Sequence, residues 1–167
     1  MFKCVSKIMG LSFCIMVFLS SCSSKQIKNE ELIVFFQQNK NDFDKLRQMY
    51  LADTNLRIIG TYKSGEEYVD LVDNKNTALS SERKAEYFQI LKRLRIMGIG
   101  SWGKNEFQKD AIFFNMFRSG SALGGSIKRI LWSSRPMSEE AVKKSGINVV
   151  NFTNIEDNWY LLCETNS

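Results

Sequence analysis

Histidine is absent from the 167-residue chain, and this limits the chemistry that its side chains can perform. Histidine-based triads, cysteine–histidine nucleophiles and histidine-ligated zinc are therefore excluded. Two Ser-x-x-Lys spacings, Ser81 with Lys84 and Ser101 with Lys104, resemble pairs in which lysine activates serine. Enzymes that use such a pair also carry Ser-Asp-Asn and Lys-Thr-Gly elements on a much larger fold, and neither tripeptide occurs here. We therefore expect no serine catalysis.

Carboxylates are the remaining route to hydrolysis or metal binding. Glycosidase-like hydrolysis needs two carboxylates that face each other across a cleft. The pairs Glu30-Glu31, Glu66-Glu67 and Glu139-Glu140 are adjacent in the chain, so their members point in different directions, as surface charges do. No Asp-x-Asp-x-Asp-Gly calcium loop is present, and we expect no metal and no cofactor. A hydrolase whose carboxylates are brought together by folding stays open as a less favoured alternative.

The run Gly98-Ile99-Gly100-Ser101-Trp102-Gly103 has the letters of the G-x-G-x-x-G dinucleotide motif. That motif must follow a strand and open a helix, so that the phosphates meet the amino end of the helix. Here the run follows a predicted helix, and we interpret it as a glycine loop that reverses the chain between helix and sheet. Trp102, which lies between Ser101 and Gly103 on this loop, is a candidate anchor for a partner or a sugar.

The amino-terminal residues have the order of a secretory signal. Two lysines precede an apolar run at 8–19, and two serines close it. The run is shorter than the roughly 20 residues that a membrane-spanning helix needs. Leu19-Ser20-Ser21-Cys22 resembles the lipobox of bacterial lipoproteins, in which a peptidase cuts before the cysteine and its thiol receives diacylglycerol. The resemblance implies lipidation of Cys22, and Ser23 after it implies retention at the outer membrane of a Gram-negative cell.

The sequence therefore divides into a signal peptide at 1–21, a tether at 22–28 and a single domain at 29–167, which is long enough for one hydrophobic core. Cys4 and Cys14 would leave with the signal, and lipid would consume Cys22. Cys163 would then be the lone thiol, which excludes an internal disulfide. We expect Cys163 to pack as a small apolar residue in the last strand, with an intermolecular bridge as the alternative.

Charge gives a weak indication of the partner. The net charge of +5 falls to +3 when Lys3 and Lys7 leave with the signal; this is a mild excess, and we do not expect a nucleic-acid partner. Lys92, Arg93 and Arg95 lie in the last turns of a predicted helix, where cations offset the negative end of the helix dipole. They form either an ordinary solvated helix end or a basic patch for phospholipid headgroups or an acidic partner. With Trp102, they are the candidate partner-binding residues.

Hydrophobic periodicity predicts an α+β fold in which amino-terminal helices pack on one face of an antiparallel sheet. We expect a helix capped by Asn29 and interrupted near 39–41, and a second helix from Ser80 or Ser81 that Gly98 stops. The other expected elements are strands at 56–62 and 68–72, a hairpin of 110–118 and 127–132 with a loop at 119–125, a short helix at 139–144 capped by Ser138, and a hairpin of 147–152 and 159–164.

This order of elements, with the strand Gly125–Trp132 and the run Ile155–Leu162, resembles a group of small uncharacterised lipoproteins of Gram-negative bacteria. The group implies no activity. We expect a non-enzymatic lipoprotein of the cell envelope, anchored by lipid and facing the periplasm, that binds a protein partner of unknown identity as an inhibitor or immunity-type protein. A structural or assembly accessory lipoprotein is the alternative.

Overall fold

The structure is a computed structural model that describes residues 27–72, 79–101, 110–121 and 124–166. The predicted signal peptide at 1–21, Cys22, most of the tether and Trp102 lie outside these residues. Among the helices that the structure describes, none combines the length and the apolar character needed to cross a membrane.

The first two helices are α1 (Asn29–Gln38) and α2 (Lys40–Ala52), and the predicted interruption falls at Asn39. The Asn39 side-chain amide donates to the Phe35 carbonyl at 2.8 Å, which adds a second hydrogen bond to a carbonyl that already accepts one from the Asn39 backbone N–H. Phe36 and Phe43, on either side of the break, are fully buried. The break therefore lets two short helices turn their aromatic faces toward one core.

The third helix, α3 (Ser81–Leu94), begins where the sequence predicts and ends earlier. The Ser80 hydroxyl accepts a hydrogen bond from the Arg83 N–H at 3.1 Å, as expected for a cap. The expected stop at Gly98 is wrong, because Arg95 adopts a left-handed φ of 53° and the Ile96 N–H donates to the Leu91 carbonyl at 3.1 Å. Gly98 instead starts a strand.

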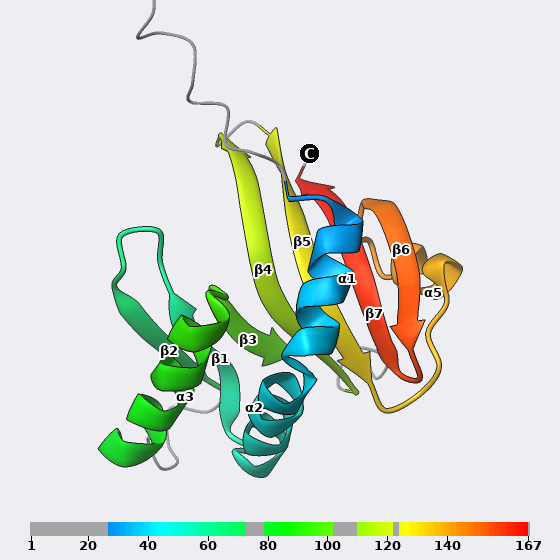
Figure 1. Cartoon of the computed structure of the whole chain (residues 1–167). Coiled ribbons are helices and arrows are strands. Elements are labelled where there is room, and N and C mark those ends of the chain that lie inside the picture. Colours follow the sequence, from blue (N-terminus) through cyan, green and yellow to red (C-terminus); the bar gives the residue numbers. More distant parts are fainter. Residues whose placement is uncertain (1–26, 73–78, 102–109, 122–123, 167) are drawn as a thin grey trace, which may run out of the picture.

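Seven strands form one antiparallel sheet in the order β2-β1-β3-β4-β5-β7-β6 (Figure 1). Their bounds are β1 Leu56–Thr61, β2 Glu67–Leu71, β3 Gly98–Ser101, β4 Ala111–Ser121, β5 Gly124–Ser133, β6 Val149–Glu156 and β7 Trp159–Asn166. The prediction of a glycine loop from Gly98 is therefore wrong for its first residues. Gly98–Ser101 form β3, which lies between β1 and β4 in the sheet. A Cβ on Gly98 would lie 2.7 Å from the Ile59 carbonyl oxygen, so this strand pair requires glycine.

The two predicted hairpins are present, and their strands are longer than expected. In β4–β5, Ser119 pairs with Ser126 and Gly120 with Gly125, so most of the predicted loop at 119–125 belongs to the strands. The two serine hydroxyls lie 2.7 Å apart, which adds a cross-strand hydrogen bond. In β6–β7 only Asp157 and Asn158 separate the strands, and Asp157 takes a positive φ of 38°.

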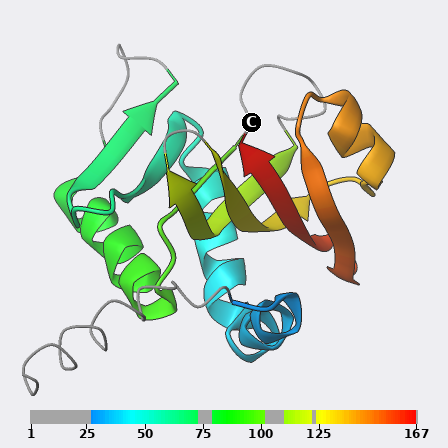
Figure 2. The same ribbon diagram turned by 90° about the horizontal axis from the view of Figure 1, so that it is seen from above.

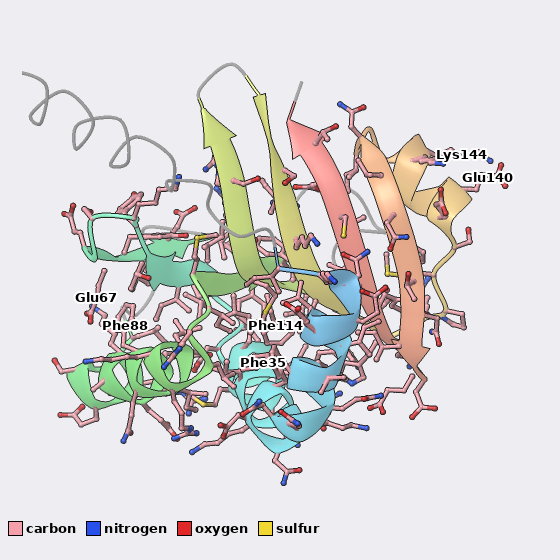
Figure 3. All side chains as sticks on the ribbon, turned by 45° about the horizontal axis from the view of Figure 1, so that its top comes forward. Phe35, Glu67, Phe88, Phe114, Glu140 and Lys144 are labelled. Carbon is pink, nitrogen blue, oxygen red and sulfur yellow. The ribbon has the colours of Figure 1, made fainter. Side chains whose placement is uncertain are left out.

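The three amino-terminal helices cover one face of the sheet, which confirms the predicted α+β arrangement (Figure 2). Between them and the sheet lie packed rings of α1, α2, β4 and β7, and Figure 3 shows Phe35 and Phe114 in this layer. The short helix α5 (Glu139–Lys144), capped by Ser138 as predicted, lies on the opposite face. There Val142 packs against Phe113, Leu131, Tyr160 and Leu162.

The start of α1 is bonded to the middle of the sheet by a buried lysine. The Lys128 ammonium on β5 donates to the Asn29 side-chain oxygen at 2.7 Å and to the Ile27 carbonyl. The prediction that Asn29 caps α1 is wrong, because Asn29 is the first helical residue. Its side-chain oxygen accepts the hydrogen bond from Lys128 in the sheet instead. Cys163 is buried in β7 as predicted, 3.4 Å from the same oxygen, and burial raises the pKa of its thiol.

Candidate functional site

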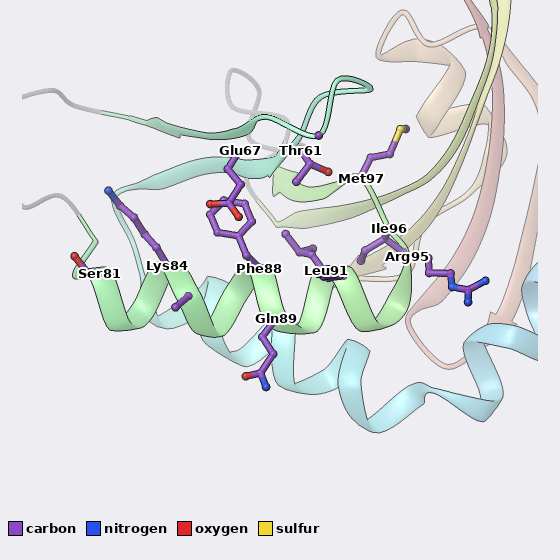
Figure 4. Close-up of a pocket in the computed structure, with 13 residues that line it drawn as sticks. Thr61, Glu67, Ser81, Lys84, Phe88, Gln89, Leu91, Arg95, Ile96 and Met97 are labelled. Atoms are coloured by element: carbon purple, nitrogen blue, oxygen red, sulfur yellow. The ribbon is translucent and has the colours of Figure 1, made fainter.

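A groove of about 870 Å³ lies between α3 and the β1–β2 hairpin (Figure 4). We call it the α3 groove. Its walls come from two parts of the chain that the sheet brings together, because β1 pairs with both β2 and β3, and β3 follows α3. The lining residues are Thr61, Gly65, Glu67, Ser81, Lys84, Ala85, Phe88, Gln89, Leu91, Lys92, Arg95, Ile96 and Met97.

The centre of the α3 groove is apolar. Phe88 is half-buried, packs against the main core and points toward the hairpin, beneath the carboxylate of Glu67 (Figures 3 and 4). Leu91 and Ile96, both buried, continue this apolar surface toward the carboxyl end of α3. The floor of the groove is therefore apolar.

The cations of α3 are divided between two faces of the helix. Arg83 and Arg93 turn toward α2, where Arg83 Nε lies 2.9 Å from Asp53 and Arg93 Nε lies 2.7 Å from Asp42. Lys84, Lys92 and Arg95 line the groove, and within the described part of the chain none of them has a carboxylate within 4.0 Å. The described lining of the groove thus carries three cations and one carboxylate, that of Glu67.

The predicted partner-binding residues therefore separate. Lys92 and Arg95 lie on the groove, Arg93 is paired with Asp42 on the other side of α3, and Trp102 is outside the described residues. Arg95 ends the helix in a left-handed conformation that glycine adopts more readily. An arginine at this position places a cation at the end of the groove.

A hydrogen-bonded network between α2 and α3 holds the helical wall of the groove. The Tyr87 hydroxyl donates to Asp53 Oδ2 at 2.7 Å, and Arg83 also donates to the Met49 carbonyl at 3.3 Å. Tyr87 is fully buried, and burial together with the Asp53 carboxylate raises the pKa of its hydroxyl. The hydroxyl therefore stays protonated as a donor, and α3 is fixed against the end of α2.

The hairpin wall is held by close strand approach and by an aromatic pair. A Cβ on Gly60 would lie 2.3 Å from the Met97 carbonyl oxygen, so β1 and β3 come together where no side chain fits. The rings of Tyr62 and Tyr68 lie 4.5 Å apart across the hairpin. Gly65 makes the turn with a positive φ of 86°, which glycine adopts without steric cost.

The groove does not assemble the catalytic arrangements that the sequence suggested. Ser81 and Lys84 both line it, but no hydrogen bond joins their side chains in the described structure. Ser101 is bonded to the Tyr50 hydroxyl at 2.9 Å, and Lys104 lies outside the described residues. Among the described residues that line the groove, Glu67 is the one carboxylate, so this part of the chain does not supply the facing acid pair that glycoside hydrolysis needs.

A smaller cavity of about 380 Å³ lies where α2 ends and α3 begins. Its charged lining residues are Asp53 and Arg83, which are bonded to each other. Among the described residues, no three His, Cys, Asp or Glu side chains are grouped so that they could hold a metal ion. The α3 groove is therefore the better candidate, and its features suit an anionic group that carries an apolar part.

Sequence reasoning found two of the groove residues from the charge at the end of α3, and it missed the role of Phe88 and Glu67. Lys84 was singled out only for its spacing from Ser81. The signal that could have found the groove is the helical spacing of Lys84, Phe88, Leu91 and Arg95, which places them on one face.

No protein-family model matches the chain, and comparisons with curated proteins and with solved structures returned no match.

Proposed function

We propose that this protein is a lipid-anchored binding protein of the bacterial envelope, without enzymatic activity, and that the α3 groove holds its partner. The lipobox-like Leu19-Ser20-Ser21-Cys22 supports the anchor, and Ser23 supports the outer membrane with the domain facing the periplasm. The partner is a protein, which this chain inhibits or neutralises in the manner of an inhibitor or immunity protein.

The observation that carries the proposal is the division of charge on α3. Cations that serve only to hold α3 in place are paired with α2, as Arg83 and Arg93 are. Lys84, Lys92 and Arg95 line the α3 side of an apolar floor and have no carboxylate partner in the described chain. A row of cations beside an apolar centre suits the recognition of an acidic surface on another protein, because the charges steer encounter and the apolar contact adds affinity.

Site-specific photo-crosslinking in the native envelope tests the proposal. A benzophenone amino acid at Ala85, an exposed groove residue, is expected to give one adduct of discrete mass. The matched control is the same amino acid at Val150, which is 66% exposed on β6, the opposite edge of the sheet from β2.

The adduct at position 85 should weaken when Lys92→Gln is added and should be unchanged by Arg93→Gln. Each variant must first show the thermal unfolding midpoint of the parent protein. Equal adduct yields from positions 85 and 150 would exclude the groove as the binding surface. So would an adduct at position 85 whose yield is unchanged by Lys92→Gln.

A further inference from the structure

We propose that the occupant of the α3 groove is an extended acidic segment of the partner, with an acidic, an apolar and an acidic side chain at alternate positions. This inference rests on the proposed function and adds the chemistry and conformation of the bound segment. It follows from the spacing of the groove residues, from the size of the groove and from its charge.

The spacing of three groove residues fits an extended chain. Lys84, Phe88 and Lys92 follow at intervals of four residues, and the helical rise places them about 6 Å apart along α3. In an extended chain, side chains on one face recur about every 6.7 Å. Positions i, i+2 and i+4 of a bound extended segment therefore lie over Lys84, Phe88 and Lys92. The matching side chains are a carboxylate at i, an apolar group at i+2 and a carboxylate at i+4.

The groove is long enough for such a segment. From Lys84 to Arg95 the helical wall is about 16 Å long. Five residues of extended chain place the first and the last Cα about 13 Å apart, so the whole alternating segment fits along this wall.

The charge of the groove sets the sign of the segment. Lys84, Lys92 and Arg95, which have no carboxylate within 4.0 Å among the described residues, line its α3 side, whereas the carboxylate of Glu67 lies over Phe88 on the hairpin side (Figure 4). Lys84 extends from α3 toward the hairpin, where it can reach a carboxylate in the groove. A neutral or basic segment would leave the three cations unpaired while it excluded water from them, which is unfavourable.

The test uses the full-length protein in a neutral detergent and fluorescein-labelled peptides with blocked ends, followed by fluorescence anisotropy. The alternating peptide is Glu-Thr-Leu-Thr-Glu between Gly-Ser flanks. The matched controls are Glu-Glu-Leu-Thr-Thr, which has the same composition in another order, and Glu-Thr-Ser-Thr-Glu, which lacks the apolar side chain. A helical competitor places Glu, Leu and Glu four residues apart on an alanine background.

The alternating peptide should bind about tenfold more tightly than each of the three other peptides. For ion pairs at an exposed site, Lys84→Gln and Lys92→Gln should each weaken its binding about threefold, and the double variant about tenfold. Arg93→Gln should leave the affinity unchanged, because Asp42 already pairs that guanidinium. The affinity should also fall as sodium chloride is raised.

Three results would overturn the inference: equal binding of the ordered and reordered peptides, tighter binding of the helical competitor, or displacement of the alternating peptide by soluble dihexanoyl phosphatidylglycerol at equal or lower concentration. The last result would assign the groove to a lipid headgroup. If these peptides fail while the crosslink at Ala85 still depends on Lys92, the proposed function stands and only the acidic segment is wrong. If the crosslink is absent, the function itself fails.

Discussion

Removal of one hydroxyl group, in Tyr87→Phe, tests whether the α2–α3 network holds the wall of the groove. Tyr87 is fully buried and donates to the charged Asp53 carboxylate at 2.7 Å. Hydrogen bonds to charged groups contribute about 1.5–3 kcal/mol, and the lower end applies here because Asp53 keeps its bond to Arg83. We expect the free energy of unfolding to fall by about 1.5 kcal/mol.

For a domain of this size, that loss corresponds to a fall in the midpoint of thermal unfolding of about 3–6 °C. Circular dichroism with heat and with urea measures it. The matched control is Tyr62→Phe, which also removes a hydroxyl but from a residue 57% exposed, and it should change stability by less than about 0.5 kcal/mol. A double-mutant cycle with Asp53→Asn then isolates the pair, and its coupling energy should be about 1 kcal/mol.

The pKa of Tyr87 gives this prediction a pH dependence with a definite sign. The folded state raises the pKa of the hydroxyl above its ordinary value of 10.0, so the stability linked to this proton is fully present below pH 10.0 and is lost as the pH rises beyond it. The difference between the parent protein and Tyr87→Phe should therefore shrink in alkali. A coupling energy near zero, or a difference that grows above pH 10.0, would refute the role assigned to this network.

Three further changes test the fold and the anchor. Gly98→Ala should destabilise the protein by about 1–3 kcal/mol in urea unfolding, because its Cβ would lie 2.7 Å from the Ile59 carbonyl oxygen; a cost below about 0.5 kcal/mol would contradict the close-approach argument. Cys163 should not react with Ellman's reagent in the folded protein, since burial raises the pKa of its thiol. After unfolding, a processed and lipidated chain should show one thiol, whereas four would mean that no processing had occurred. Cys22→Ser should abolish labelling with radioactive palmitate and release the domain from the membrane fraction, and unchanged labelling would rule out the lipid anchor.

The sequence predicted the elements well where one local signal decides them. Ser80 and Ser138 cap helices because a short side-chain oxygen can reach the free N–H groups of a first turn, and both do so here. Asn39 marks a break between two runs of aromatic spacing. The turn-rich run Asn154-Ile155-Glu156-Asp157-Asn158 predicted a hairpin of the last two strands, and the sheet pairs them.

The errors fall at residues whose role is set by a distant strand. Gly98 has the sequence signature of a helix stop, but its small size is needed where β3 meets Ile59 and Gly60 on β1, far away in the chain. Asn29 has the signature of a cap, but a buried lysine on β5 takes its side-chain oxygen. Local propensity cannot indicate such partners, because they depend on which strands become neighbours.

The same reasoning explains why only part of the candidate site could be predicted. Lys92 and Arg93 are adjacent cations, and their charge alone gives no ground for treating them differently. The packing of α2 beside α3 brings Asp42 to Arg93 and leaves Lys92 on the side of the hairpin. A cation on a helix becomes available to a partner only when the neighbouring helix supplies it no carboxylate. The division of charge on α3, and the groove that follows from it, is therefore a property of the tertiary fold.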